Sequence, residues 1–290
     1  MATQVAEPVD RLVPVRGLNL HVRQWPGERR PWLLVHGLAS NCLTWEATAR
    51  HLHAAGHPVV TVDQRGHGHS DKPDTGYSFD DVTADLRELI DALGFQEPLI
   101  AGQSWGGNVV LAFGARYPGA AAGITFVDGG FINLSNIPGA TWDTISVQLK
   151  PPALAGTPRA QMQQRMRNAH PDWSDEGIEH QLGNFEALAD GTIRPWLTLD
   201  RHMQILRSLW EQRPGDLYPA VQEPVLIAPA DGGGGDWAAR KHHEVEAAQA
   251  ALPNARVHWF TNTDHDIHVQ RPRELADLLL GAVQEGFFPG

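Results

Sequence analysis

The chain has 290 residues, of which 42% are hydrophobic and 20% are charged, proportions typical of a globular protein and not of a disordered one. Its formal net charge is −11 with neutral histidines, which argues against a protein that binds nucleic acid, because phosphates require a cationic surface. A chain of this length buries roughly three quarters of its unfolded surface, enough for one large core with a smaller lobe attached.

Cysteine content and apolar runs bear on the location of the protein. Cys42 is the only cysteine, so no disulfide can form within the chain and nothing demands an oxidising compartment. The first residues are polar and acidic, without the apolar centre of a signal peptide. No apolar run approaches the roughly 18 residues of a membrane span. We therefore expect a cytoplasmic protein that does not bind membranes.

The first 130 residues alternate between strand-like and helix-like patterns. Residues 11–16 and 18–25 alternate in polarity and predict a hairpin joined at Gly17. Later apolar runs are denser, as in buried parallel strands, and lie at residues 32–37, 57–66, 98–101 and 123–130. Residues 44–56 predict a helix, and 78–94 predict a clearer one, with a capping-box start at Ser78 and Asp81 and a stop at Gly94.

The alternation stops near residue 132. Residues 133–219 are broken by prolines and look helical, without a convincing strand, and are rich in Trp and Met. The strand and helix patterns then resume until the end of the chain. We therefore predict one core formed by residues 1–132 and 220–290, interrupted by a helical lobe at 133–219.

A serine lies between glycines in "AGQSWGG", residues 101–107. An apolar strand precedes Ser104 and a helical pattern follows it, so the serine sits at a sharp corner. A serine hydroxyl is a poor nucleophile unless a base takes its proton and donors hold the resulting oxyanion. Side chains at positions 102 and 106 would crowd such a corner, and Gly107 allows close packing of the helix. This pattern predicts a nucleophilic serine.

Four segments resemble the α/β-hydrolase family and occur in that family's order. They are "LLVHGLAS" at 33–40, "DQRGHGHSDKP" at 63–73, "GQSWGG" at 102–107 and "TDHDIHVQRP" at 263–272. The resemblance covers nearly the whole chain. It implies an α/β fold with a mostly parallel, eight-stranded sheet flanked by helices, and a helical cap inserted over the serine of an esterase-like site.

The resemblance also implies roles for individual residues. Ser104 would be the nucleophile and His265 the base, because the spacing from His265 to Pro272 fits the family pattern. His268 is the rival base. The backbone N–H groups of Leu38 and Trp105 would form the oxyanion hole.

The third member of the triad should be a carboxylate that orients the imidazole. Asp231 follows the apolar run "VLIAPA", and the order Ser104, Asp231, His265 is that of the family. The stretch "APAD" and the four glycines after Asp231 depart from the family pattern. Asp128, after the preceding strand, and Asp236 therefore remain alternatives.

No metal or cofactor is expected. Asp63, His67 and His69 suggest a metal cluster, but their segment matches a structural loop of the family and no second ligand set has metal spacing. Cys42 is interpreted as a small buried residue.

The predicted activity is hydrolysis of small to medium, fairly apolar carboxylic esters through an acyl-enzyme. The same residues could act as a lactonase, a thioesterase, a perhydrolase or a carbon–carbon bond hydrolase. The last would need a cation for a substrate carboxylate, for which the cap offers Arg165, Arg167, Arg194 and Arg201. A receptor that binds a ligand on the same fold is the non-enzymatic alternative. The sequence predicts neither the natural substrate nor the oligomeric state.

Overall fold

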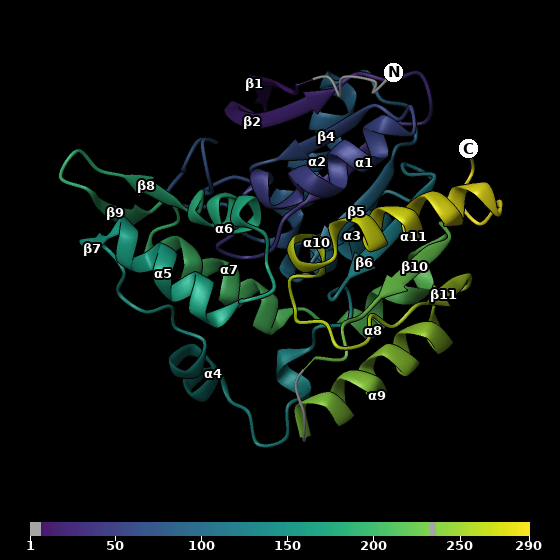
Figure 1. Cartoon of the computed structure of the whole chain (residues 1–290). Helices are drawn as coiled ribbons and strands as arrows, with labels where there is room; N and C mark the ends of the chain where they lie inside the picture. Colours follow the sequence, from purple (N-terminus) through teal and green to yellow (C-terminus); the bar gives the residue numbers. More distant parts are fainter. Residues whose placement is uncertain (1–6, 233–235) are drawn as a thin grey trace.

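A computed structural model of the chain describes residues 7–232 and 236–290. Its centre is an eight-stranded sheet in the order β1-β2-β4-β3-β5-β6-β10-β11 (Figure 1). Strands β1 and β2, and β2 and β4, are antiparallel, and all later neighbours are parallel. The predicted fold class is confirmed. The strands are β1 (Val9–Val15), β2 (Leu18–Trp25), β3 (Trp32–Val35), β4 (Val59–Val62), β5 (Leu99–Gln103), β6 (Gly123–Val127), β10 (Val225–Ala228) and β11 (Ala255–Val257).

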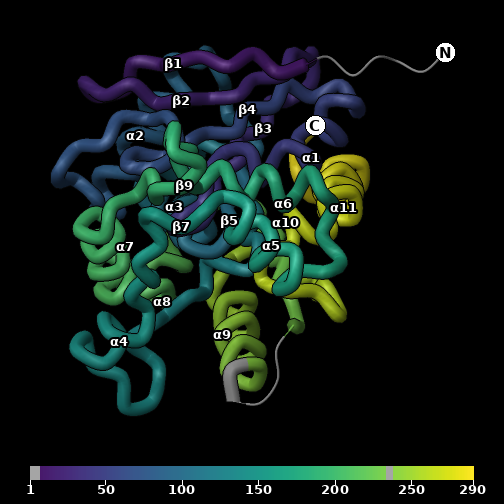
Figure 2. The backbone as a smooth tube through the Cα atoms, turned by 60° about the vertical axis from the view of Figure 1, so that its left-hand side comes forward, coloured from purple at the N-terminus to yellow at the C-terminus, as the bar shows by residue number. Residues whose placement is uncertain are grey.

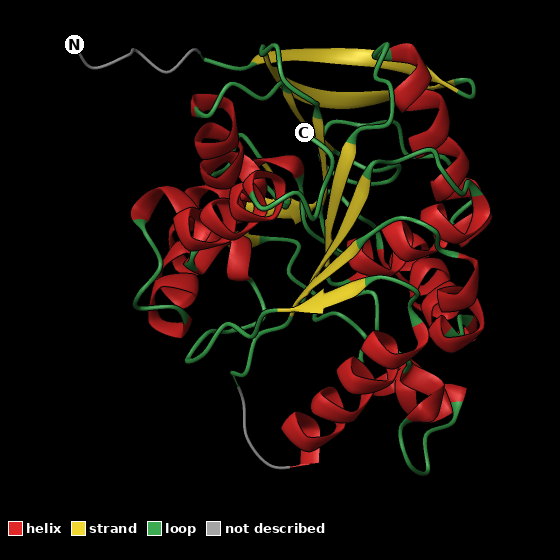
Figure 3. Cartoon of the chain, turned by 90° about the vertical axis from the view of Figure 1, so that its right-hand side faces the viewer, coloured by secondary structure: helices red, strands yellow, loops and turns green. Residues whose placement is uncertain are grey.

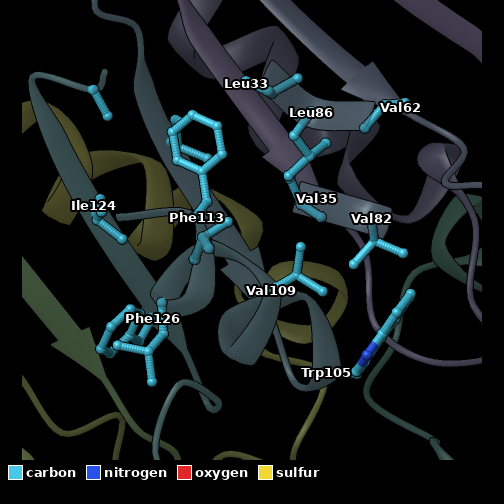
Figure 4. Packing of buried hydrophobic residues seen from close by; sticks show 14 of the residues in the cluster. Leu33, Val35, Val62, Val82, Leu86, Trp105, Val109, Phe113, Ile124 and Phe126 are labelled. Carbon is cyan, nitrogen blue, oxygen red and sulfur yellow. The ribbon is translucent and has the colours of Figure 1, made fainter. Parts of the chain in front are cut away.

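Helices cover both faces of this sheet (Figure 3). Successive side chains of a strand point to opposite faces, so strands buried on both sides are apolar throughout. In β3, Leu33 and Val35 join the core cluster beneath α2 (Phe79–Ala92), α3 (Trp105–Arg116) and α9 (Asp236–Ala251), part of which Figure 4 shows. Trp32 and Leu34 join the opposite cluster, beneath α1 (Glu46–Ala54) and α11 (Pro272–Gln284).

Two local predictions in the first third of the chain are confirmed. Val15 pairs with Leu18, so the first hairpin turns at Arg16 and Gly17, whose φ angles are 50° and 78°. The side chain of Ser78 accepts a hydrogen bond from the backbone N–H of Asp81 and caps α2. The helix ends at Ala92, two residues before Gly94.

The insertion between β6 and β10 is not purely helical. It contains a three-stranded sheet, so the prediction that this lobe has no strand is wrong. These strands have two to four residues, too few to show a period in the sequence. The elements are η2 (Leu134–Asn136), α4 (Trp142–Gln148), β7 (Thr157–Pro158), α5 (Arg159–Ala169), α6 (Asp175–Leu182), β8 (Phe185–Ala187), β9 (Thr192–Pro195), α7 (Leu199–Glu211), α8 (Pro214–Leu217) and η3 (Tyr218–Ala220).

This cap, residues 133–219, lies in front of β5 in Figure 2. Its own small core includes Met162 and Trp173 and is completed by Val269 of α10 (Ile267–Gln270). The division into core and cap at those boundaries stays a prediction. In the part of the chain that the structure describes, no helix is both long and apolar enough to cross a lipid bilayer.

Several side-chain hydrogen bonds attach the cap to the core, one of them from Asn136 to Glu244 of α9 (2.7 Å). On one side, the side-chain amide of Asn41 donates to the backbone oxygen of His180 (2.9 Å), in α6. On the other, the guanidinium of Arg201, in α7, donates to the backbone oxygens of Lys72 (2.8 Å) and Pro73 (3.0 Å). Both sides of the cap are therefore held to loops at one edge of the sheet.

Candidate active site

Ser104 occupies a tight corner between β5, which ends at Gln103, and α3, which begins at Trp105. Its backbone has φ 55° and ψ −122°, a region that side-chain-bearing residues rarely adopt and that costs roughly 1–3 kcal/mol. A Cβ added at Gly102 would lie 2.2 Å from the backbone oxygen of Gly106, and one at Gly106 would lie 2.5 Å from the backbone oxygen of His36. The glycines are therefore required by close backbone contacts, as predicted.

His265 lines a cavity of about 320 Å³ together with Ser104 and Asp128. Its Nδ1 donates a hydrogen bond of 2.6 Å to Oδ2 of Asp128. This bond fixes the tautomer in which Nε2 is free to accept a proton. The structure thus brings the predicted nucleophile and the predicted base to one cavity, with a carboxylate behind the base.

The rival histidine, His268, belongs to the core. It is fully buried, and its ring lies 4.7 Å from the ring of Trp45. Burial lowers the pKa of His268 to about 3, so the ring is neutral at ordinary pH. Among the described residues, no hydrogen-bond partner reaches either of its nitrogens.

The prediction that Asp231 pairs with His265 is wrong in this structure, and the alternative Asp128 takes its place. Both residues leave neighbouring parallel strands, β6 and β10, at the same edge of the sheet. Asp128 directly follows β6 and is only 2% exposed. Asp231 comes three residues after β10, and its backbone N–H donates to the oxygen of Phe260. The second alternative, Asp236, has its side chain outside the described part.

The Asp128 carboxylate is surrounded by donors. Besides the bond from His265, it accepts from the backbone N–H of Ala230 (3.0 Å) and from Nζ of Lys241, 2.9 Å from each of its oxygens. Burial opposes ionisation, but the hydrogen bond from His265 and the nearby positive charges outweigh it and lower the pKa of Asp128. Partial desolvation works against protonation of His265, whose side chain is half exposed, yet its bond to Asp128 and that carboxylate's charge raise the pKa of His265.

The loop predicted to carry the oxyanion hole touches the serine. A Cβ added at Gly37 would lie 3.1 Å from Cβ of Ser104. His36 holds this loop, because its Nδ1 donates to the oxygen of Gly37 (2.7 Å) while its Nε2 accepts from the backbone N–H of Gln64 (3.0 Å). Within the described ranges, no acceptor is bonded to the N–H groups of Leu38 or Trp105. Both donors are available, and their role as an oxyanion hole stays a prediction.

The cavity is lined by both apolar and polar side chains. The apolar side chains are Phe131, Ile132, Leu134, Ile137, Leu149 and Leu209. The polar side chains include Arg240, Lys241 and Glu244 of α9 besides Ser104, Asp128, Asn133 and His265. Sequence reasoning missed this contribution, because the segment "RKHH" has the composition of a solvated helix face. Its position in the helix that follows Asp231 in the chain was the available signal.

The four cap arginines considered as substrate cations lie elsewhere. The residues that line the cavity in the described chain include none of them. Arg194 is paired with Glu186, and Arg167 with Asp175. Arg201 is bound to the loop at 72–74.

One buried group has ligands of the kind that bind metals. Atoms of His21, Cys42 and Asp63 lie within 4.8 Å of one another. The Asp63 carboxylate already accepts bonds from the His21 ring (2.8 Å) and from the backbone N–H groups of Cys42 (2.8 Å) and His69 (2.9 Å). Burial raises the pKa of the Cys42 thiol, whereas metals bind the thiolate. These contacts fit a structural loop, and the expectation of no metal stays a prediction.

A family model described as "Alpha/beta hydrolase family" matches residues 32–278. "Epoxide hydrolase 1" of Caenorhabditis elegans is 32% identical over 111 residues, which are 37% of this chain and 27% of that protein. The chain thus spans about a quarter of that relative. "2-(acetamidomethylene)succinate hydrolase" of Mesorhizobium japonicum is 27% identical over 232 residues, 78% of this chain and 80% of that protein.

A solved structure shows the same fold. The crystal structure of an E-2-(acetamidomethylene)succinate hydrolase superposes with a TM-score of 0.77 at 22% identity, and the match covers 96% of this chain and 99% of that one. With the sheet order, the corner at Ser104 and the family match over most of the length, the conclusion is plain: the chain belongs to the alpha/beta hydrolase family.

Proposed function

We propose that the protein is a serine hydrolase that cleaves carboxylic esters through an acyl-enzyme. The observation that carries the proposal is the bond between His265 and Asp128 at the cavity that also contains Ser104. A base oriented by a buried carboxylate beside a half-buried serine at the cavity is the arrangement that activates a hydroxyl for attack on a carbonyl carbon.

The reaction follows from these positions. Ser104 Oγ bonds to the carbonyl carbon while its proton moves to Nε2 of His265, and Asp128 stabilises the resulting imidazolium. The N–H groups of Leu38 and Trp105 hold the oxyanion. His265 then protonates the leaving alcohol, and later takes a proton from the water that releases the acid. The scheme requires no cofactor.

The cavity favours small to medium substrates with an apolar part. Its volume is about 320 Å³, at the lower end of the usual range for small-molecule sites. Leu134, Ile137 and Leu209 offer apolar contacts for the acyl or alcohol group. Epoxide opening, suggested by the name of one relative, is less suited to this site, because an aspartate nucleophile is expected there and this chain has Ser104.

A second candidate is hydrolysis of an ester or amide whose acyl part carries a carboxylate. Arg240 is one of the residues that line the cavity and supplies a positive charge for such a group. The hydrolase of Mesorhizobium japonicum, which the alignment covers over most of its length, is named for a succinate derivative. Lactones, thioesters, carbon–carbon cleavage and perhydrolysis need the same triad and remain alternatives.

A substrate panel tests these proposals. We expect p-nitrophenyl esters of short fatty acids to be cleaved, and the Ser104→Ala variant to lose activity by about 10⁴-fold or more. Faster cleavage of succinate monoesters than of neutral esters of equal length, abolished by Arg240→Gln, would favour the second candidate. Equal rates for the wild type and Ser104→Ala on every substrate would refute the hydrolase and favour a ligand-binding receptor.

The proposal also covers the cellular location of the protein and its partners. We retain the cytoplasm as its location, supported by the single cysteine and the absence of any disulfide partner for it. The net charge of −11 supports a small-molecule substrate and not a nucleic-acid partner.

A further inference from the structure

Lys241 is an unusual neighbour for a catalytic carboxylate. It lies in α9 and is only 9% exposed, although it forms part of the cavity wall. Its Nζ is 2.9 Å from both oxygens of Asp128 and 2.9 Å from the backbone oxygen of Ala230. An ammonium group has three donors, and all three are used here. Lys241 is therefore committed to the protein and is not a ligand for substrate.

Burying an ammonium is costly unless it is paired and fully hydrogen-bonded. Here the partner is a carboxylate that is itself only 2% exposed. Each of the two charges compensates the other, so Asp128 can remain ionised away from water even while His265 is neutral. Without Lys241, the bonds that the described residues still offer to the buried carboxylate are those from Ala230 and His265.

On these contacts we propose that Lys241 is a positioning residue of the active site, which fixes the orientation of the Asp128 carboxylate and offsets its negative charge. The proposal rests on the hydrolase function proposed above, since it assigns Lys241 a role through the base of that reaction.

The pattern of bonds shows how the orientation is fixed. Oδ1 of Asp128 accepts from Ala230 and Lys241, and Oδ2 accepts from His265 and Lys241. Rotation of the carboxylate would break bonds on both oxygens at once. Oδ2 therefore stays aimed at Nδ1 of His265, which in turn fixes the ring at the cavity that Ser104 also lines.

The charge of Lys241 also acts on the base. Asp128 and Asp266 favour the protonated form of His265, and Lys241 opposes them. His268, on α10, is neutral. Arg240 and Glu244 of α9 carry opposite charges at the same cavity. Removing Lys241 would leave the field of Asp128 unopposed, so the pKa of His265 would rise and the ring would become protonated at higher pH.

Three variants test the proposal: Lys241→Met removes charge and donors, Lys241→Gln removes the charge but keeps donors, and Lys241→Arg keeps both. His243→Met, at an exposed position of the same helix, is the matched control. The titration of the His265 ring is followed by NMR, with its signals assigned by their absence in His265→Asn. The pH profile of kcat/KM is measured in parallel.

We expect the His265 titration to move to higher pH in Lys241→Met and Lys241→Gln. The ratio of kcat/KM at pH 6 to that at pH 9 should fall about threefold or more. Lys241→Arg and His243→Met should leave the titration in place. An unchanged titration in folded Lys241→Gln would overturn the proposal, and Lys241→Gln decides the test if Lys241→Met does not fold.

The NMR titration needs no substrate, so the two proposals can fail separately. If the His265 titration moves in the Lys241 variants but the protein cleaves no substrate of the panel, only the proposed hydrolase function is refuted. If the protein hydrolyses substrates through Ser104 but the His265 titration does not move in the Lys241 variants, only the proposed role of Lys241 is refuted.

Discussion

Ser104 and the pair of His265 and Asp128 are held in place by different forces. Around Ser104, backbone atoms meet backbone atoms: Gly102 lies against Gly106, and Gly106 lies against the carbonyl of His36. Around His265, charged side chains meet at hydrogen-bond distance, with Asp128 between the imidazole and the ammonium of Lys241.

The first region depends on shape and the second on charge. Steric contacts do not titrate, so the corner at Ser104 should be insensitive to pH and salt. The pair of His265 and Asp128 depends on protonation, and its performance should change with pH and with each neighbouring charge. A reaction that uses both regions should respond to changes in packing at Ser104 and to changes in charge around His265. Substitutions made in one region at a time can separate the two effects.

The largest effect is expected on the charged side. Asp128→Asn should lower kcat/KM by about 10⁴-fold, because the amide cannot stabilise the imidazolium and favours the wrong tautomer. Asp231→Asn is the matched control and should change kcat/KM little. Steady-state kinetics on one p-nitrophenyl ester is sufficient. If Asp231→Asn proves the more damaging change, Asp231 is the acid and the pairing of His265 with Asp128 is not the one used in catalysis.

The steric side is tested by Gly106→Ala. The added methyl group would lie 2.5 Å from the carbonyl oxygens of Val35 and His36, so the backbone must move. A displacement of about 1 Å at a nucleophile can cost about 100-fold in rate, and we expect a loss of that order with a lower Tm. Gly281→Ala is the control, since a Cβ at Gly281 meets nothing within 4 Å. Full activity in Gly106→Ala would contradict the steric account.

The smallest effect is a pH dependence of the unmodified protein. The pKa of His265 is raised above its ordinary value by Asp128, and only the neutral ring can accept the serine proton. Activity is therefore present above that pKa and lost as pH falls through it, by about tenfold per unit once the ring is protonated. A profile of kcat/KM measured between about pH 5 and 9 should show this limb. A flat profile in a folded protein would exclude His265 as the base.

Local patterns in the sequence were sufficient to predict the steric side. The strand before Ser104, the glycines around it and the helix after it are contiguous, and the structure gives each a reason in backbone contacts. The helix start at Ser78 was predicted for the same reason, since a cap is a contact between residues three apart.

The charged side could not be predicted in the same way. Strands β6 and β10 are adjacent and parallel, so Asp128 and Asp231 both emerge at one edge of the sheet. The pair that forms joins Asp128 and His265, 137 positions apart in the chain, and Lys241, 113 positions after Asp128, completes the group. Likewise, the cap strand β7 has only two residues, too few to show a pattern in the sequence. It is a strand because its backbone pairs with β9.

The attachment of the cap limits where specificity can vary. Asn41 fastens α6 and Arg201 fastens α7, whereas several apolar walls of the cavity come from the stretch between β6 and α5, including Ile132, Ile137 and Leu149. Substitutions of these wall residues would change the size of the proposed acyl pocket without touching the hydrogen bonds made by Asn41 and Arg201. Divergence towards new substrates has an easy route through this one segment.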